Sequence, residues 1–333
     1  MGNLDFASSS PRVWLVTGCS SGIGRELVTA ILSRGDKVIP TVRRLSDLEY
    51  VNAIPGATDR LYPLELDVTM PELELSAKVR NAIAHMGRID VLVNNAGFVM
   101  SGVWEEISES EMRRQFETNF YGALKMTRCV LEPMRMQRSG AILFMGSIAG
   151  WYGHAAGGPY SASKFAIEGA AECLSRETMH LGIRVHVFVL GMFRTSILSP
   201  NNKNKTYNST TIQDYVTVQE NSRRRHQEGD GKQLGNPRLA AHKMMDAVAL
   251  MFASSTPLPH RIPLGSDALT IIKRKCMDTM EGLKGWDAFA SSTDIVEDPL
   301  LSPSYYRLQC NVTSCKPELP KGIAPATLGL SRL

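Results

Sequence analysis

The amino-acid sequence predicts an α/β domain built on a doubly wound parallel sheet, with one long inserted loop and an extended C-terminal tail. Three observations lead to this fold class. Short apolar runs alternate along the chain with stretches of helical periodicity. The apolar runs are nearly continuous, as expected when helices cover both faces of a parallel sheet. Glycine and polar residues follow directly after several of these runs, where ligands of such folds bind.

The first three predicted strands lie between residues 12 and 68. VWLVTG (residues 13–18) is a buried strand that leads through a glycine-rich turn into an amphipathic helix ending near residue 35. KVIPTVRR (37–44) and RLYPLELDV (60–68) are the second and third strands. The helix that follows covers residues 69–87, with Thr69 predicted as its N-cap and Gly87 as its C-cap.

The next units complete the sheet. IDVLVNNAG (89–97), GAILFMGS (140–147) and IRVHVFVLG (183–191) are the fourth, fifth and sixth strands. A capping box of Ser108 and Glu111 opens a long helix to about residue 137, and another helix covers residues 159–181. HRIPLG (260–265) adds a short last strand between helices over residues 236–255 and 266–290.

Two segments interrupt this alternation. Residues 192–236 are polar and weakly periodic, and their position after a strand end predicts a substrate lid or loop. Their run Arg223-Arg224-Arg225 is most simply a solvated helix face. Prolines indicate an extended tail over residues 291–333. We therefore predict an N-terminal extension over residues 1–11, one domain over 12–290 and the tail over 291–333.

Composition and charge argue against several kinds of function. The 37 basic and 33 acidic residues give a net charge of +4, too even a balance to favour nucleic acid or an anionic membrane surface. No apolar stretch approaches the roughly 18 residues that a membrane-spanning helix needs. The six cysteines have the spacing of neither a zinc site nor a disulfide framework, so we predict no metal and a reducing compartment.

Four motifs in register indicate a family that the chain resembles. They are the glycine turn Thr17-Gly-Cys-Ser-Ser-Gly-Ile-Gly24, then Asn94-Asn-Ala-Gly97, Ser147 and Tyr160-Ser-Ala-Ser-Lys164. In this order and spacing the motifs resemble those of the short-chain dehydrogenase/reductase family, over residues 12 to about 290. The resemblance implies a Rossmann-type fold, a nicotinamide cofactor, and interconversion of an alcohol with a ketone or aldehyde.

The glycine turn and the ends of the following strands form the predicted cofactor site. Glycines let backbone N–H groups approach a pyrophosphate, and the helix N-terminus adds its dipole. The resemblance implies that Asp67 contacts the adenine and that Thr195 reaches the carboxamide. The predicted set is Thr17, Gly18, Ser21, Gly22, Ile23, Gly24, Thr41, Arg43, Asp67, Val68, Asn95, Ala96, Gly97, Tyr160, Lys164 and Thr195.

The charge at the end of the second strand favours NADP(H) over NAD(H). An acidic residue there would bind the adenosine ribose and repel a 2′-phosphate. Val42 occupies the family's acidic position in this chain, and Arg43, a residue type suited to phosphate recognition, follows it. Asp36 precedes the strand, so we interpret it as a turn residue.

Tyr160 and Lys164 lie one helical turn apart, so a cation beside the phenol could lower its pKa, although the same spacing fits a polar helix face. The resemblance implies that Tyr160 exchanges a proton with the substrate oxygen and that Lys164 holds the nicotinamide ribose and depresses the tyrosine pKa. It also implies that Ser147 hydrogen-bonds the substrate oxygen and that Asn119 anchors a water molecule. The alternatives are a strand-end cap for Ser147 and a helix cap for Asn119.

Segments after the fourth, fifth and sixth strands are expected to build an apolar pocket for a hydrophobic or aromatic substrate. Each of its residues could equally be core packing, and for His154 we favour ordinary loop hydrogen bonding over catalysis. Leu190 stands where the family usually has proline, which predicts a looser loop over the nicotinamide. The predicted pocket residues are Phe98, Met100, Trp151, Tyr152, His154, Met192 and Phe193.

The sequence therefore predicts an NADP(H)-dependent oxidoreductase acting on a hydrophobic carbonyl compound or alcohol. A non-catalytic nicotinamide-binding sensor or scaffold, or an epimerase or dehydratase of the same fold, are the alternatives. The oligomeric state stays open between a monomer and a homo-oligomer. Ser331-Arg332-Leu333 resembles the peroxisomal import tripeptide, which predicts an import receptor as a partner and a peroxisomal location. The alternative is a chance tripeptide and a cytoplasmic location.

Overall fold

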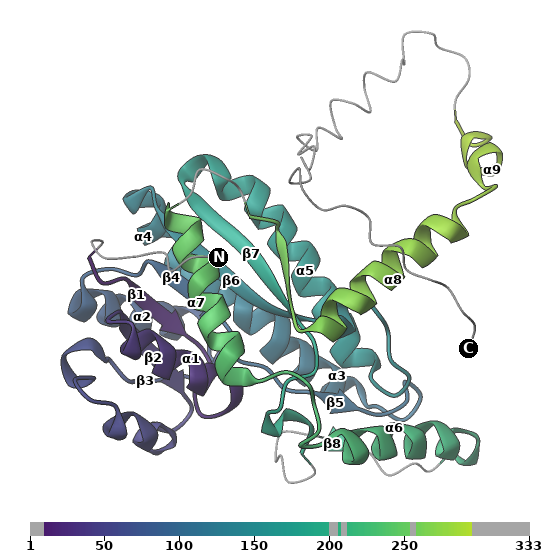
Figure 1. Cartoon of the computed structure of the whole chain (residues 1–333), viewed down its shortest axis with the longest axis horizontal. Coiled ribbons are helices and arrows are strands. Elements are labelled where there is room, and N and C mark those ends of the chain that lie inside the picture. Colours follow the sequence, from purple (N-terminus) through teal and green to yellow (C-terminus); the bar gives the residue numbers. More distant parts are fainter. Residues whose placement is uncertain (1–9, 200–205, 208–211, 254–257, 295–333) are drawn as a thin grey trace, which may run out of the picture. The chain divides into compact units, whose positions relative to one another are not determined.

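A seven-stranded parallel sheet forms the centre of the fold (Figure 1). The computed structural model describes residues 10–199, 206–207, 212–253 and 258–294. The strand order is β3-β2-β1-β4-β6-β7-β9, and every neighbouring pair is parallel. The doubly wound α/β prediction is confirmed. The strands are β1 Val13–Val16, β2 Lys37–Val42, β3 Leu64–Glu65, β4 Val91–Asn94, β6 Gly140–Ser147, β7 Ile183–Leu190 and β9 Arg261–Leu264.

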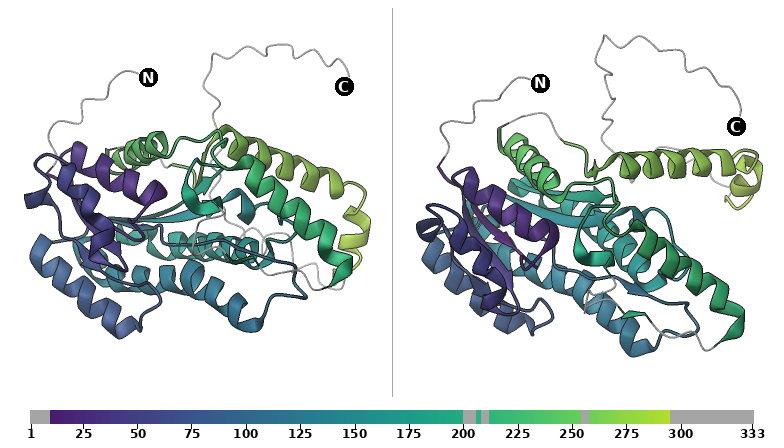
Figure 2. Two further views of the ribbon diagram at one scale, coloured as in Figure 1. Left: turned by 90° about the horizontal axis from the view of Figure 1, so that it is seen from below. Right: turned by 60° about the horizontal axis from the view of Figure 1, so that its bottom comes forward.

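Helices cover both faces of the sheet, as Figure 2 shows in two further views. One layer contains α1 (Gly22–Ser33) and α7 (Pro237–Ala253), and the other contains α2 (Glu72–Met86), α4 (Ala123–Gln137) and α5 (Gly158–Thr178). Successive strand residues point to opposite faces, so Trp14 packs in the first layer and Leu15 in the second. Both side chains are fully buried, which explains why β1 is apolar on both of its faces.

The predicted long helix over residues 108–137 is interrupted. The capping box of Ser108 and Glu111 opens α3 (Glu109–Phe116), as predicted. A π-helical turn, Glu117–Gly122, then separates α3 from α4. Val68 lies where a Cβ on Gly122 would stand, so the chain passes close to the segment that follows β3 at this turn. A π turn inside a helix often marks a functional position, and this one contains Asn119.

Other boundaries differ from the predictions. Thr69 does not cap α2, which begins at Glu72 with Pro71 at its N-cap position. Thr69 instead donates its backbone N–H and its hydroxyl to Asp67 Oδ1, at 2.9 and 2.8 Å. The described part of the 192–236 insertion contains a helix, α6 (Val216–Gly229), and a short strand, β8 (Thr206–Tyr207). β8 pairs with β5 (Met100–Ser101) in a second small sheet that periodicity did not reveal.

The chain divides into two compact units, Met1–Asp278 and Thr279–Leu333. The predicted helix over residues 266–290 forms as α8 (Ser266–Gly282) and α9 (Asp287–Ser291), and the predicted domain end at residue 290 lies inside the second unit. In that unit, the rings of Trp286 and Phe289 meet edge to face at 5.0 Å. Most of the predicted extension over residues 1–11 and of the tail over 291–333 lies outside the described residues. In the described residues, no helix combines the length and apolarity needed to cross a membrane.

Candidate active site

The candidate site lies at the carboxyl ends of the strands. The chain forms β1, β2 and β3 toward one edge of the sheet and then returns to place β4 on the other side of β1. This reversal leaves a crevice between the segments that follow β1 and β4, which is where such sheets bind ligands. A cavity of about 790 Å³ occupies this position, and residues that follow β1, β2, β3, β4, β6 and β7 line it.

The turn after β1 fits a dinucleotide phosphate. Gly18 has φ +71°, and a Cβ there would lie 2.8 Å from the Ala96 Cα, so only glycine fits this close approach. Ser21, the N-cap of α1, makes no side-chain cap hydrogen bond, and the first turn of α1 holds no acidic residue. The first N–H groups of the helix therefore keep their capacity for an anion.

Thr17 and Asn95 hold this turn against β4. The Thr17 hydroxyl accepts hydrogen bonds from the backbone N–H groups of Asn95 and Ala96, both at 2.9 Å. The Asn95 side chain donates to the carbonyl oxygens of Thr17 at 2.8 Å and of Gly18 at 3.0 Å. Thr17 is buried and lies behind the cavity wall, as does Gly24, so these two predicted cofactor residues support the turn and do not line the cavity.

The adenosine end of the cavity has the polar groups that the sequence indicated. Thr41, Arg43 and Asp67 line it, and the buried Thr41 hydroxyl has no hydrogen-bond partner among the described residues. Asp36 lies elsewhere, because its carboxylate accepts from the Arg12 backbone N–H at 3.0 Å and from Trp14 Nε1 at 2.9 Å. Its interpretation as a turn residue is confirmed.

The loop after β7 is tethered by two hydrogen bonds, and the predicted loosening that Leu190 would cause stays a prediction. Gly191 donates its N–H to the Leu264 carbonyl at 2.9 Å, and Met192 donates to Asp267 Oδ2 at 2.6 Å. A Cβ at Gly191 would overlap the Asp267 carboxylate. Asp267, at the start of α8, thus anchors the beginning of this loop. Thr195, farther along the loop, approaches Gly22 of the glycine turn.

Ser147, Tyr160 and Lys164 meet at the inner wall of the cavity. Ser147 ends β6, and its hydroxyl accepts from the Ala149 N–H at 3.1 Å and is hydrogen-bonded to the Tyr160 hydroxyl. Lys164 lies one turn after Tyr160 on α5, and its Nζ donates to the Met145 carbonyl at 2.6 Å. The same Nζ is 5.7 Å from the centroid of the Tyr160 ring.

Burial has the largest effect on the pKa values of Tyr160 and Lys164. It raises the pKa of Tyr160 above its ordinary value, and the hydrogen bond from Ser147 offsets only part of that rise. Lys164 is not among the causes of this shift, and the depression of the tyrosine pKa by Lys164 stays a prediction. Burial also lowers the pKa of Lys164 to about 8, against the opposing charge of Glu168. Arg261 binds the buried Glu168 carboxylate at 2.9 Å and so stabilises its charged form.

Asn119 ties two walls of the site together. Its Oδ1 accepts from the Phe98 N–H at 3.1 Å, and its Nδ2 donates to the Phe98 carbonyl at 3.1 Å and to Ser163 Oγ at 3.3 Å. Both amide hydrogens are thereby engaged with protein groups, and the side chain does not line the cavity. We therefore assign it a positioning role, linking the segment after β4 to α5.

The pocket prediction was right in part. Phe98, His154, Met192 and Phe193 line the cavity. Met100 is buried in the core, Tyr152 is 54% exposed, and Trp151 packs outside the cavity against Arg261. The remaining predicted cofactor residues do line it: Ser21, Gly22, Ile23, Val68, Asn95, Ala96, Gly97 and Thr195.

Sequence reasoning missed the residues at the far end of the cavity. Those with polar or charged side chains are Ser101, Arg114, Thr118, Ser161, Ser222, Arg225 and His226. The arginine run was visible in the sequence, but nothing in it showed that α6 lies over the site. Periodicity cannot place a helix that follows a long weakly patterned segment.

The comparisons with known proteins give the family. Residues 12–206 match the family model described as short chain dehydrogenase, and the chain belongs to this family. Its members are oxidoreductases that act on CH–OH or C=O groups, and the predicted resemblance is confirmed.

Individual proteins agree with this placement. The oxidoreductase calM of Penicillium decumbens is 38% identical over 195 residues, covering 56% of this chain and 62% of that protein. A 3-ketodihydrosphingosine reductase of Bacteroides thetaiotaomicron is 35% identical over 192 residues, 58% of this chain and 68% of that protein. The solved structure of a short-chain dehydrogenase from Streptomyces avermitilis is 33% identical with a TM-score of 0.74, covering 86% of this chain and all of that one. The chain thus spans less than two thirds of the first of these relatives.

Proposed function

We propose that the chain is an NADP(H)-dependent oxidoreductase that interconverts a hydrophobic or aromatic ketone or aldehyde with the corresponding alcohol. The observation that carries this proposal is one continuous cavity. The glycine turn lies at one end of it, and Ser147, Tyr160 and Lys164 lie together on its wall. The names of relatives such as the 3-ketodihydrosphingosine reductase support reduction of a carbonyl group.

The chain's own residues supply the proton chemistry. A nicotinamide cofactor, when bound, supplies or takes up the hydride. In reduction, the Tyr160 hydroxyl donates its proton to the substrate oxygen. In oxidation, the deprotonated Tyr160 oxygen accepts the proton that the substrate alcohol loses. The single hydroxyl hydrogen of Ser147 turns from Tyr160 to the same substrate oxygen and stabilises the charge that develops there. The Lys164 ammonium has further N–H groups besides the one that it donates to the Met145 carbonyl, and these can donate to the ribose hydroxyls of the cofactor.

The chain's residues fit a dinucleotide phosphate and its adenosine. Gly18 provides the close backbone approach, α1 provides unsatisfied N–H groups, and the buried Thr41 hydroxyl needs a partner. Arg43 lines the same end of the cavity, while Asp36 is engaged by Arg12 and Trp14. These features support NADP(H) over NAD(H), because an arginine can bind a 2′-phosphate and no free carboxylate from Asp36 opposes it.

Substitution of Arg43 with alanine should change the choice of cofactor. We expect NADP(H) binding to weaken by about 1.5–3 kcal/mol, because a charge-assisted phosphate contact is lost, with NAD(H) binding nearly unchanged. Dissociation constants for both reduced cofactors, from nicotinamide fluorescence, measure this difference. Arg80→Ala, on an exposed residue of α2 outside the cavity, is the matched control. Equal losses for both cofactors in Arg43→Ala would contradict the assignment.

A panel of ketones, aldehydes and secondary alcohols tests the proposed activity directly. Nicotinamide absorbance is followed with NADP(H) and with NAD(H) for each compound. Turnover of hydrophobic carbonyl compounds, faster with NADPH than with NADH, is the expected result. Cofactor binding with no turnover of any compound would favour the sensor or scaffold alternative.

We also propose import into peroxisomes through Ser331-Arg332-Leu333, which lie outside the described residues. An import receptor must read the terminal carboxylate with these side chains. Deleting residues 331–333 from a protein tagged at its N-terminus should move it from peroxisomes to the cytosol, with activity in solution unchanged. Fluorescence microscopy beside a peroxisomal marker provides the measurement. A full-length protein that is already diffuse in the cytosol would show the tripeptide to be a coincidence.

A further inference from the structure

The half of the cavity beyond Ser147 and Tyr160 carries positive charge. Arg114 comes from α3, Arg225 and His226 come from α6, and all three line this half. Of the described residues that line the cavity, the carboxylates are Asp47 and Asp67, which follow β2 and β3 at the adenosine end. A cleft lined by one sign of charge concentrates ligands of the opposite sign.

Arg225 carries the strongest part of this argument. No hydrogen bond or ion pair joins it to any residue within the described ranges. Its neighbour Arg224 lies outside this cavity and donates to Asn221 Oδ1 at 2.8 Å. Arg113, which precedes Arg114, also faces away from the cavity and is paired with Glu109 at 2.6 Å. The neighbouring arginines outside the cavity thus have partners, whereas Arg225, at its edge, has none among the residues that the structure describes.

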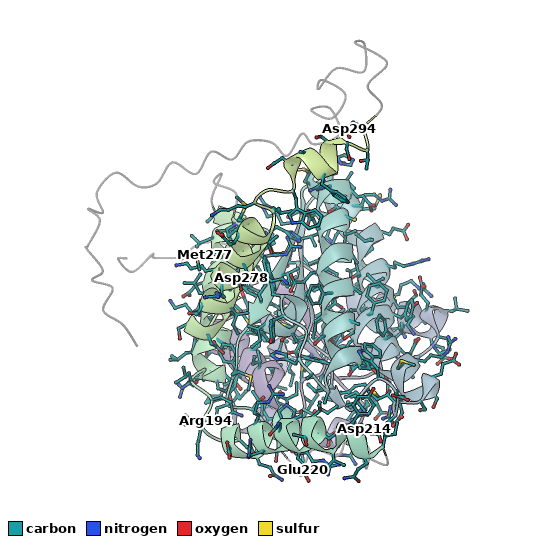
Figure 3. The ribbon with its side chains drawn as sticks, turned by 90° about the vertical axis from the view of Figure 1, so that its right-hand side faces the viewer. Arg194, Asp214, Glu220, Met277, Asp278 and Asp294 are labelled. Atoms are coloured by element: carbon teal, nitrogen blue, oxygen red, sulfur yellow. The ribbon has the colours of Figure 1, made fainter. Side chains whose placement is uncertain are left out.

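The charge of Arg225 acts inside the cavity. His154, on the loop between β6 and α5, is half-buried and lines the same half. Burial lowers the pKa of His154, and the nearby positive charge of Arg225 lowers it further. Figure 3 shows α6, which carries the labelled Glu220, along one edge of the molecule, with Asp214 of the preceding turn beside it. A helix in this position can present Arg225 to a ligand that extends out of the cavity.

Apolar side chains line part of the wall between the catalytic group and these cations, beside the hydroxyls of the serines and the threonine named above. The Arg114 guanidinium lies 5.7 Å from the centroid of the Phe98 ring, which also lines the cavity. Met192 and Phe193 line it from the loop after β7. A ligand that spans this half therefore meets apolar side chains as well as hydroxyls between Tyr160 and the cationic end.

We propose that the substrate is an anionic amphiphile, with its reacting carbon at Ser147 and Tyr160 and a carboxylate or phosphate bound by Arg225 and Arg114. This inference rests on the proposed oxidoreductase function and adds the class of substrate. Arginine suits both anions, because its planar fork of N–H groups matches their oxygen atoms. An apolar segment joins the reacting group to the anion.

The test compares charged and neutral forms of the same ketone. The probes are phenyl ketones that carry a terminal carboxylate on a short, medium or long methylene chain, together with their methyl esters and the corresponding phosphate monoesters. Binding is measured by calorimetry on the full chain saturated with the oxidised nicotinamide cofactor. A ketone cannot be reduced in that complex, so binding is separated from turnover.

For at least one length of the methylene chain, we expect the carboxylate or the phosphate probe to bind at least about fivefold more tightly than the methyl ester at low salt. The stronger of the two anions identifies the group that the site recognises. Arg225→Gln should remove this preference and leave the ester affinity unchanged, which also shows that the variant is folded. Arg224→Gln is the matched control and should keep the preference. Raising the salt from about 20 to about 200 mM should weaken anion binding and spare the ester.

Two results would overturn the inference. One is equal binding of esters and anions at every chain length, including no binding of either. The other is a loss of anion affinity in Arg225→Gln no larger than that in Arg224→Gln. Turnover of the same ketones with the reduced cofactor is scored separately. Its absence would contradict the proposed oxidoreductase function, whereas the anion preference is decided by calorimetry alone.

Discussion

Tyr160→Phe is expected to lower kcat by about 10²- to 10⁴-fold, the usual contribution of a positioned proton donor or acceptor. The change removes only the hydroxyl, which is hydrogen-bonded to Ser147 at the cavity wall. The ring and its packing stay in place, so the affinity for NADP(H) should remain within about twofold of the wild type. Steady-state kinetics on the best substrate of the panel, with cofactor affinity from fluorescence, give both quantities.

A folding defect must be separated from a chemical one. The thermal midpoint of Tyr160→Phe should lie close to that of the wild type, because the hydroxyl contributes one hydrogen bond to the fold. Tyr152→Phe removes a hydroxyl from an exposed tyrosine of the neighbouring loop, and it should leave kcat unchanged. Substantial turnover in Tyr160→Phe would sink the assignment of the proton donor.

Lys164→Met is expected to reduce both turnover and cofactor affinity. The side chain is buried, and its Nζ is anchored on the Met145 carbonyl beside Tyr160. Loss of its remaining N–H donors should weaken NADP(H) binding by about tenfold, and loss of its charge should lower kcat by at least about 10²-fold. Tyr160→Phe is the comparison, because it should lose turnover alone. Unchanged cofactor affinity in Lys164→Met would contradict the ribose contact.

The pH dependence gives a second readout for Lys164. Burial lowers the pKa of the ammonium to about 8, and Glu168 opposes that shift. The group is therefore charged below this pH and loses its proton as the pH rises through it. We expect kcat/KM of the wild type to fall above about pH 8 and Lys164→Met to lack this fall. A wild-type profile that stays flat to pH 10 would argue against a required ammonium.

Much of the fold could be predicted because the strands are buried on both faces. A nearly continuous apolar run such as residues 140–147 admits few interpretations when helical periods flank it. The π turn could not be predicted, because its residues continue the helical pattern of α3 and α4. Only tertiary contacts distinguish this turn from the helices around it. They are the close approach of Gly122 to Val68 and the three hydrogen bonds of Asn119.

The catalytic part of the site was also visible in the sequence. The ends of adjacent parallel strands meet at one edge of a sheet, so Ser147 and the glycine turn had to lie on the same side. Side-chain direction was less predictable. Met100 and Trp151 lie close to strand ends, but Met100 points into the core and Trp151 toward Arg261. The role of Asp267 depends on a contact across 75 residues, which no local pattern reveals.

The most direct test of the central claim is hydride transfer itself. NADPH carrying deuterium at both C4 positions is incubated with the carbonyl compounds of the panel, and the alcohols formed are analysed by mass spectrometry. The oxidoreductase assignment predicts one deuterium on the former carbonyl carbon with the wild type, and at least about 100-fold slower formation of that labelled alcohol with Tyr160→Phe. Cofactor that binds the wild-type protein yet passes no deuterium to any carbonyl carbon would contradict it.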